Sequence, residues 1–284
     1  MKTPTISKRA KSVPSFKVMD VLQRANELQS QGHDVIHCEV GQPESGAPTP
    51  VAAAAVDSLS VRHVMGYTDA FGLLELREKI SQYYVKKYGE SAKGSNANSG
   101  SRVDSKNIVV TTGSSGGFLL AFTACFDAGD IIAVASSGYP CYRNILGALG
   151  CEIANVPINE EFKLTAKELK TEVLKRKELG QKEIKGLILS SPSNPTGSML
   201  SPQELKDLCE LCDEEGIQFL SDEIYHGISY GKEEATALSF SPNAIVINSF
   251  SKYYSSESLR WCKDKRVSFP LMSRILSLTK ILSH

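Results

Sequence analysis

The segment LILSSPSNPTG, residues 187–197, sets the fold class of this 284-residue chain. It is a short apolar run that ends in serine and is followed by a turn containing two prolines and a glycine. Similar short runs rich in Ile and Val occur at 108–111, 131–135, 153–156, 217–220 and 245–248. Helical patterns lie between most of them, at 116–126, 142–149, 165–179 and 202–215. Apolar strands joined by helices predict an α/β fold: a three-layer, mainly parallel sheet covered by helices on both faces.

The chain before residue 108 has a different pattern. Apolar residues at helical spacing predict one helix over 16–31, ended by Gly32, and a second over 72–88. Residues 35–40 resemble a short strand that leads into a turn at Gly41. Residues 90–106 are rich in Ser, Gly and Asn and predict a flexible surface insertion.

The composition is that of an ordinary globular chain, and it argues against several kinds of partner. Hydrophobic residues make up 41% and charged residues 23%, and 32 Lys and Arg balance 32 Asp and Glu. A chain without net charge has no long-range field that would gather nucleic acid or an anionic membrane. No apolar stretch approaches the roughly 18 residues of a membrane span. We therefore expect a small-molecule function, with no nucleic-acid or membrane partner.

The seven cysteines predict a reducing compartment, because they are odd in number, scattered and mostly within apolar runs. Cys209 and Cys212 form a single pair on a predicted helix, which favours packed thiols over a metal site, and the histidines show no ligand spacing. We expect no metal and a cytoplasmic location. The first 19 residues are basic and acid-free, so organelle targeting stays open beside the simpler interpretation of a solvated arm.

Polar clusters follow the predicted strands, and ligands of such sheets bind at the carboxyl ends of the strands. The run at 108–111 leads into Gly113, Ser114 and Ser115 and then a helix. A glycine-rich turn that opens a helix offers backbone N–H groups and a positive dipole end, which bind phosphate. This turn matches neither the dinucleotide fingerprint nor the Walker loop, so a plain turn is the alternative.

Three later strand ends carry Asn194, Asp222 and Lys252. A lysine between Ser249 and Ser251 can form an imine with an aldehyde cofactor, and the two hydroxyls can reach a phosphate. A carboxylate such as Asp222 keeps a pyridinium nitrogen protonated, which makes the ring an electron sink. Asp222 alone also fits a buried structural carboxylate or a helix cap, and its combination with Asn194 and Lys252 favours the functional role.

The ordered combination of Asn194, Asp222 and Lys252, spaced 28 and 30 residues apart, resembles the signature of class I and II aminotransferases of fold type I. These enzymes use pyridoxal 5'-phosphate (PLP). The resemblance implies that Lys252 holds PLP and moves the substrate α-proton and that Asp222 is the partner of the ring nitrogen. It also implies that Asn194 and Tyr225 hydrogen-bond the phenolic oxygen of the ring, with Asn194 near the substrate.

Other positions match the family more loosely. The turn at 113–115 resembles its phosphate-binding turn, and Tyr139 stands where an aromatic stacks on the pyridine ring. Tyr67 resembles the tyrosine that reaches across a homodimer to the neighbour's cofactor phosphate. Gly41 matches a loop near the substrate carboxylate. Each of these residues also fits an ordinary turn or a core aromatic.

The resemblance covers about 16–255 and then fails. Ser258 replaces a family glycine, whereas Arg260 keeps the place of an arginine and is either a phosphate contact or a chance surface arginine. The family's C-terminal part, which supplies the arginine that grips the substrate carboxylate, has no counterpart before His284. We expect 1–50 to be an N-terminal arm and partial small-domain segment and 51–258 to be the PLP-binding large domain. Residues 259–284 would be a divergent tail with an amphipathic helical pattern.

The resulting hypothesis is PLP-dependent transfer of an amino group between an amino acid and a 2-oxo acid, carried out by a homodimer. Two alternatives stay open. One is a truncated, non-catalytic chain that binds PLP or pairs with a full-length subunit, and the other is a PLP lyase of the same fold. The absent arginine predicts weak activity for the truncated form. Apolar faces that the missing region would cover predict low stability. The sequence does not identify the amino acid substrate.

Overall fold

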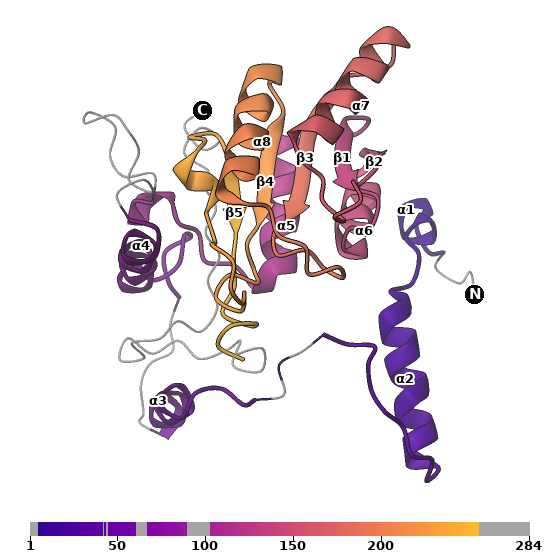
Figure 1. The fold of residues 1–284 in the computed structure, drawn as a ribbon. Helices are drawn as coiled ribbons and strands as arrows, with labels where there is room; N and C mark the ends of the chain where they lie inside the picture. The colour runs from indigo at the N-terminus through magenta and orange to yellow at the C-terminus, as the bar shows by residue number, and fades with distance from the viewer. Residues whose placement is uncertain (1–4, 42, 44, 61–66, 90–102, 256–284) are drawn as a thin grey trace.

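A five-stranded parallel sheet forms the centre of the computed structural model, which describes residues 5–41, 43, 45–60, 67–89 and 103–255. The strand order is β2-β1-β3-β4-β5 (Figure 1). The strands are β1 (Ile131–Ala135), β2 (Glu152–Val156), β3 (Ile184–Ser190), β4 (Gln218–Asp222) and β5 (Ile245–Ile247). Every pair is parallel, so the predicted α/β class is confirmed.

Helices cover both faces of the sheet and make three layers (Figure 1). On one face lie α7 (Ala166–Glu178) and α8 (Pro202–Glu215), and on the other lie α5 (Gly113–Cys125) and α6 (Pro140–Leu149). Successive strand residues alternate between the two cores: Leu187 packs with the α7 and α8 side and Ile188 with the α5 and α6 side. Fully burying one such side chain stabilises the folded chain by about 1.5–3 kcal/mol, so the helices on both faces contribute to the stability of the sheet.

Capping residues explain why α7 and α8 begin where the sequence predicts. Thr165 and Glu168 form a capping box at α7, and Ser201 and Glu204 form another at α8. Lys163 forms an ion pair with Glu204 at 3.2 Å and joins the two helix starts. α7 follows β2 and α8 follows β3, so the capping residues start both helices at the edge of the sheet where the strands end.

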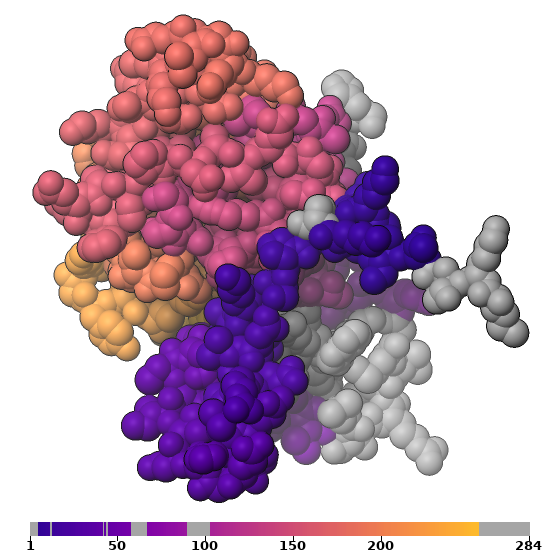
Figure 2. Space-filling view, turned by 90° about the vertical axis from the view of Figure 1, so that its right-hand side faces the viewer, coloured from indigo at the N-terminus to yellow at the C-terminus, as the bar shows by residue number. Residues whose placement is uncertain are grey.

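Among the described residues before position 90 there are four helices: α1 (Lys8–Ser12), α2 (Lys17–Ser30), α3 (Thr49–Ser60) and α4 (Leu74–Tyr88). α2 protrudes from the body formed by the sheet and its helices (Figures 1 and 2). All side chains of α2 are at least partly exposed. α4 instead packs on the core, because Ile80 and Tyr84 join the cluster of α7 and α8.

Three local predictions were wrong. Residues 35–40 form no strand ladder in the described structure, and Ile36 is 84% exposed, because no neighbouring strand lies beside this segment. The predicted strand at 108–111 is reduced to a single bridge at Val109. The insertion predicted over 90–106 is shorter than expected, because Val103 is completely buried and Ser105–Asn107 forms a short 3-10 helix, η2. Residues 90–102 lie outside the described part.

Two further features bear on compartment and partners. Cys209 and Cys212 are buried thiols on the core face of α8. Burial raises the pKa of the Cys212 thiol well above its ordinary value, as expected for a packed, protonated thiol. Within the described ranges, each helix is too short or too polar to cross a lipid bilayer.

Candidate active site

The strand-end residues selected from the sequence surround one cavity of about 1190 Å³. It lies where β3, β4 and β5 end and where α5 and α6 begin, because parallel strands bring their carboxyl ends to one edge. The predicted residues that line it are Gly41, Gly113, Ser114, Ser115, Tyr139, Asn194, Asp222, Tyr225, Ser249, Ser251 and Lys252. Lys232 is a second lysine of the lining.

Asp222 ends β4 and is only 4% exposed. Its Oδ2 accepts a hydrogen bond from the Tyr142 hydroxyl, and its Oδ1 accepts one from the Ile224 backbone N–H at 3.2 Å. Burial and the neighbouring Asp222 charge raise the pKa of Tyr142 well above its ordinary value, so this hydroxyl remains a donor. The carboxylate is therefore held at the floor of the cavity in its acceptor form.

Tyr142 is a residue that the sequence reasoning missed. It lies on α6, three residues after Tyr139, and its ring packs edge to face on the Tyr139 ring with centroids 5.5 Å apart. Tyr139 is the N-cap residue of α6, and its spacing of three residues from Tyr142 is the signal that could have identified Tyr142, because residues at i and i+3 lie on one side of a helix.

Asn194 and Tyr225 form a hydrogen-bonded pair. The Asn194 side-chain amide donates to Tyr225 Oη at 2.9 Å. Ser190 of β3 and Asp222 of β4 are register partners, so the segments that follow the two strands start side by side. Since Tyr225 Oη accepts from Asn194, its own proton can be donated toward the cavity.

The cavity also contains donors suited to an anion. α5 begins at Gly113, which has φ of +83°, and no side chain caps its first turn at Thr112. The first N–H groups of a helix lack acceptors within the helix, and they bind phosphate in many proteins. The Ser249 and Ser251 hydroxyls lie 2.6 Å apart on the turn after β5 and line the same cavity.

Lys252 occupies the turn after β5, and its Nζ donates to the Gly41 carbonyl at 3.4 Å. The next residue, Tyr253, places its ring directly over Gly227, where a Cβ atom would lie 2.6 Å from Tyr253 Cδ2. The close approach of glycine and ring joins the segment that bears Tyr225 to the turn that bears Lys252.

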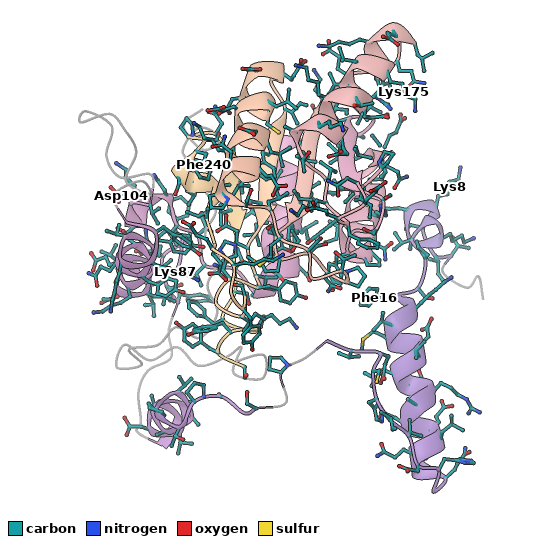
Figure 3. All side chains as sticks on the ribbon, in the orientation of Figure 1. Lys8, Phe16, Lys87, Asp104, Lys175 and Phe240 are labelled. Atoms are coloured by element: carbon teal, nitrogen blue, oxygen red, sulfur yellow. The ribbon has the colours of Figure 1, made fainter. Side chains whose placement is uncertain are left out.

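The N-terminal segment closes one side of the cavity. Phe16 lies at the end of α2 nearest the sheet (Figure 3). Its ring packs edge to face on Tyr139 with centroids 5.8 Å apart. Met19 and Leu22 of α2 also line the cavity, so α2 adds apolar side chains to a lining that includes the polar Asp222.

Two predicted residues are not among this group. Tyr67 is fully exposed, at 106%, and is not in the cavity lining. Arg260 and the predicted helical tail at 259–284 lie outside the described residues. The boundary predicted at residue 50 falls inside α3 (Thr49–Ser60).

Comparison with known proteins identifies related sequences. The sequence model of the family described as "Aminotransferase class I and II" matches residues 33–261, which include every strand of the sheet and Lys252.

Curated relatives and a solved structure give the same picture. The chain is 43% identical over 262 residues to the valine–pyruvate aminotransferase of Mycobacterium tuberculosis, covering 91% of this chain and 62% of the relative. It is 35% identical over 258 residues to the (5-formylfuran-3-yl)methyl phosphate transaminase of Methanocaldococcus jannaschii, covering 90% and 62%. A crystal structure of an aminotransferase from Mycobacterium tuberculosis matches with a TM-score of 0.82 at 40% identity, covering 98% of this chain and 65% of that one. The chain therefore spans less than two thirds of these proteins.

Proposed function

Because the chain belongs to the aminotransferase class I and II family, we propose that it binds PLP at Lys252 and transfers an amino group between an amino acid and a 2-oxo acid. The observation that carries the proposal is the convergence of an amine, a buried carboxylate and a phenol–amide pair on one cavity: Lys252, Asp222 and Tyr225 with Asn194. We propose that the PLP-binding domain corresponds to the predicted 51–258, with its first boundary moved to the start of α3 at Thr49.

Members of this family use PLP, and the donor set of the cavity fits that cofactor. Lys252 offers the amine for the aldehyde, and Asp222 offers an anionic acceptor for the pyridinium nitrogen. The first turn of α5, with Ser249 and Ser251, offers donors for the phosphate. Tyr139 offers an aromatic face for the ring.

When bound, PLP supplies an aldehyde for the substrate amine and a ring that withdraws electrons from the reacting Cα. The residues of the chain then divide the work. The substrate amine would displace Lys252 from the cofactor, and the freed Nζ would then accept the proton from the substrate Cα. A positioned base of this kind contributes about 10²–10⁴-fold in rate. Asp222, fixed by Tyr142 and the Ile224 amide, would supply negative charge to the ring nitrogen. The Asn194–Tyr225 pair would donate to the phenolic oxygen and stabilise its negative charge.

The active assembly is proposed to be a homodimer. Tyr67 is exposed, and the apolar side chains of Leu119 and Leu120 are 50% and 41% exposed on α5, the helix whose first turn lines the cavity. Exposed apolar side chains next to a site favour a protein interface. Light scattering during size-exclusion chromatography tests this proposal, and a monomer at all concentrations would oppose it.

The proposed location is the cytoplasm. The cysteines of the described residues are free thiols, at positions 38, 125, 141, 151, 209 and 212. Free thiols persist in reducing compartments. Fractionation of the source cells tests the assignment.

The transfer of an amino group is tested by single half-reactions. The purified chain is loaded with PLP and mixed with valine, alanine or aspartate, chosen because similar proteins are named for valine–pyruvate and aspartate transamination. Loss of the visible band, with one 2-oxo acid formed per site, supports the proposal. The Lys252→Ala variant is the control and should show no turnover. No spectral change with any amino acid would oppose the proposal, and ammonia release would favour a lyase.

A further inference from the structure

His226 directly follows Tyr225 but does not line the cavity, and it has no role in the proposed reaction. It is 6% exposed, and both of its ring nitrogens have partners. Nε2 lies 2.9 Å from the Ser191 carbonyl oxygen, and Nδ1 lies 2.6 Å from Tyr88 Oη. A carbonyl oxygen only accepts, so Nε2 carries the proton and donates to Ser191. In a neutral ring Nδ1 is then the acceptor, and Tyr88 donates to it.

These two hydrogen bonds join three separate segments. Ser191 begins the loop that carries Asn194, His226 directly follows Tyr225, and Tyr88 belongs to the last turn of α4. The Asn194–Tyr225 pair spans the same two segments at 2.9 Å on the cavity side. The His226–Ser191 bond is thus a second, buried tie between the segments that hold the pair.

The electrostatic surroundings keep the His226 ring neutral. Burial lowers the pKa of His226 to about 4, opposed by the charge of Glu234. Lys87 forms an ion pair with Glu234 at 2.7 Å, which offsets that charge. Glu223 Oε2 lies 3.5 Å from His226 Nδ1, and burial raises the pKa of Glu223 to about 8, so this carboxyl is mostly uncharged at neutral pH.

α4 supports the same region at a second point. Asn248, which precedes the turn that carries Lys252, donates to Tyr84 Oη at 2.7 Å and accepts from the Ser249 N–H at 2.7 Å. Tyr84 and Tyr88 are four residues apart and so share one face of the helix. The same face of α4 therefore anchors the Lys252 segment through Tyr84 and the Tyr225 segment through Tyr88.

We propose that His226 is a positioning residue for the cofactor site: held by Tyr88, it donates to Ser191 and fixes the Asn194 loop against Tyr225. This inference rests on the proposed function, because the Asn194–Tyr225 pair is assigned to the phenolic oxygen of PLP. Its consequence is electronic. When the pair is out of place, the phenolic oxygen loses donors that stabilise its negative charge, and the visible band of the bound cofactor titrates at a higher pH.

The test compares His226→Leu and His226→Gln in the PLP-loaded full chain. Leucine has no donor for Ser191, whereas the glutamine side-chain amide can replace the Nε2 proton. One net hydrogen bond corresponds to about half to one pKa unit, so His226→Leu should raise the titration midpoint of the visible band by about that amount. His226→Gln should stay near the parent value. The exposed His33, changed to leucine, is the matched control and should not shift the midpoint.

The outcomes separate the two proposals. If the parent chain forms no yellow complex with PLP, the proposed function fails at cofactor binding, and with it the inference built on it. If the parent binds PLP and His226→Leu titrates as the parent does, the positioning role is overturned while the proposed function stands. If His226→Leu does not fold, Tyr88→Phe decides: it keeps the ring and removes the hydroxyl that donates to Nδ1. A shift in the same direction supports the inference, and an unchanged midpoint overturns it.

Discussion

Gly227→Ala should destabilise the chain by about 2–5 kcal/mol, because two separate costs coincide at this position. Gly227 has φ of +101°, and a residue with a side chain in that region costs about 1–2 kcal/mol. The added methyl would lie 2.6 Å from Cδ2 and 2.8 Å from Cγ of Tyr253. Overpacking of this kind costs about 1–3 kcal/mol. The Tyr253 ring also packs edge to face on the Tyr254 ring, with centroids 4.7 Å apart, so a shift of Tyr253 would disturb this contact.

Urea unfolding of four variants separates the two costs: Gly227→Ala, Gly231→Ala, Tyr253→Ala and the double variant Gly227→Ala/Tyr253→Ala. Gly231→Ala is the matched control, because Gly231 has φ of +67° and an added Cβ would meet no described atom within 4 Å. It should lose only the conformational part, about 1–2 kcal/mol. In the double variant Gly227→Ala/Tyr253→Ala, the clash is removed and the steric part should be recovered as a coupling energy between the two sites.

The same change should weaken attachment of PLP, because Tyr253 directly follows Lys252 and its displacement moves the turn. The reasoning is refuted if Gly227→Ala is no less stable than Gly231→Ala. It is also refuted if Gly227→Ala lowers the free energy of unfolding by the same amount in the Tyr253→Ala background as in the parent, since the clash with the ring would then contribute nothing.

Three further predictions follow from single contacts. Asp222→Asn should keep PLP bound yet slow the half-reaction by about 10–150-fold, the equivalent of a charged hydrogen bond of about 1.5–3 kcal/mol; stopped-flow rates equal to the parent would remove Asp222 from the mechanism. Burial raises the pKa of Glu223 to about 8, so the folded state binds this proton more tightly than the unfolded state, and the stability that it contributes is lost as pH rises from about 4.5 to 8. The lowered pKa of His226 has the opposite effect, because stability then rises with pH between about 4 and 6.5. Above pH 6.5 only the effect of Glu223 is left of these two. Urea midpoints should therefore show Glu223→Gln gaining on the parent between pH 6.5 and 8.5, and parallel curves would contradict this. Thr165→Ala removes the α7 capping box and should cost about 0.5–2 kcal/mol in the same assay, whereas no loss would show that the cap is not stabilising.

The fold class was predictable because its signals are local. Each strand is a short apolar run, and buried parallel strands need no partner-specific pattern. The positions of Asn194, Asp222 and Lys252 at strand ends then followed from topology, since parallel strands bring their carboxyl ends together. The rule that a short apolar run predicts a strand failed for 35–40, because this run has no neighbouring strand to pair with in the described structure.

The supporting contacts were not predictable, because they join residues that are distant in sequence. Tyr88 and His226 are 138 residues apart, and Tyr142 and Asp222 are 80 apart. No spacing rule relates such pairs, and each depends on how a helix is placed on the sheet. Val103 shows the same limit, since a polar segment precedes it and only packing against α4 and the sheet explains its complete burial.

The central claim is that Lys252 is the residue that holds PLP, and trapping the bound cofactor tests it most directly. The chain loaded with PLP is reduced with borohydride, digested and mapped by mass spectrometry. We expect one labelled peptide, with the label on Lys252, and an unlabelled Lys252→Ala variant. Lys232 lines the same cavity and is the sharpest alternative. A label on Lys232, or on no lysine, would contradict the assignment of this site.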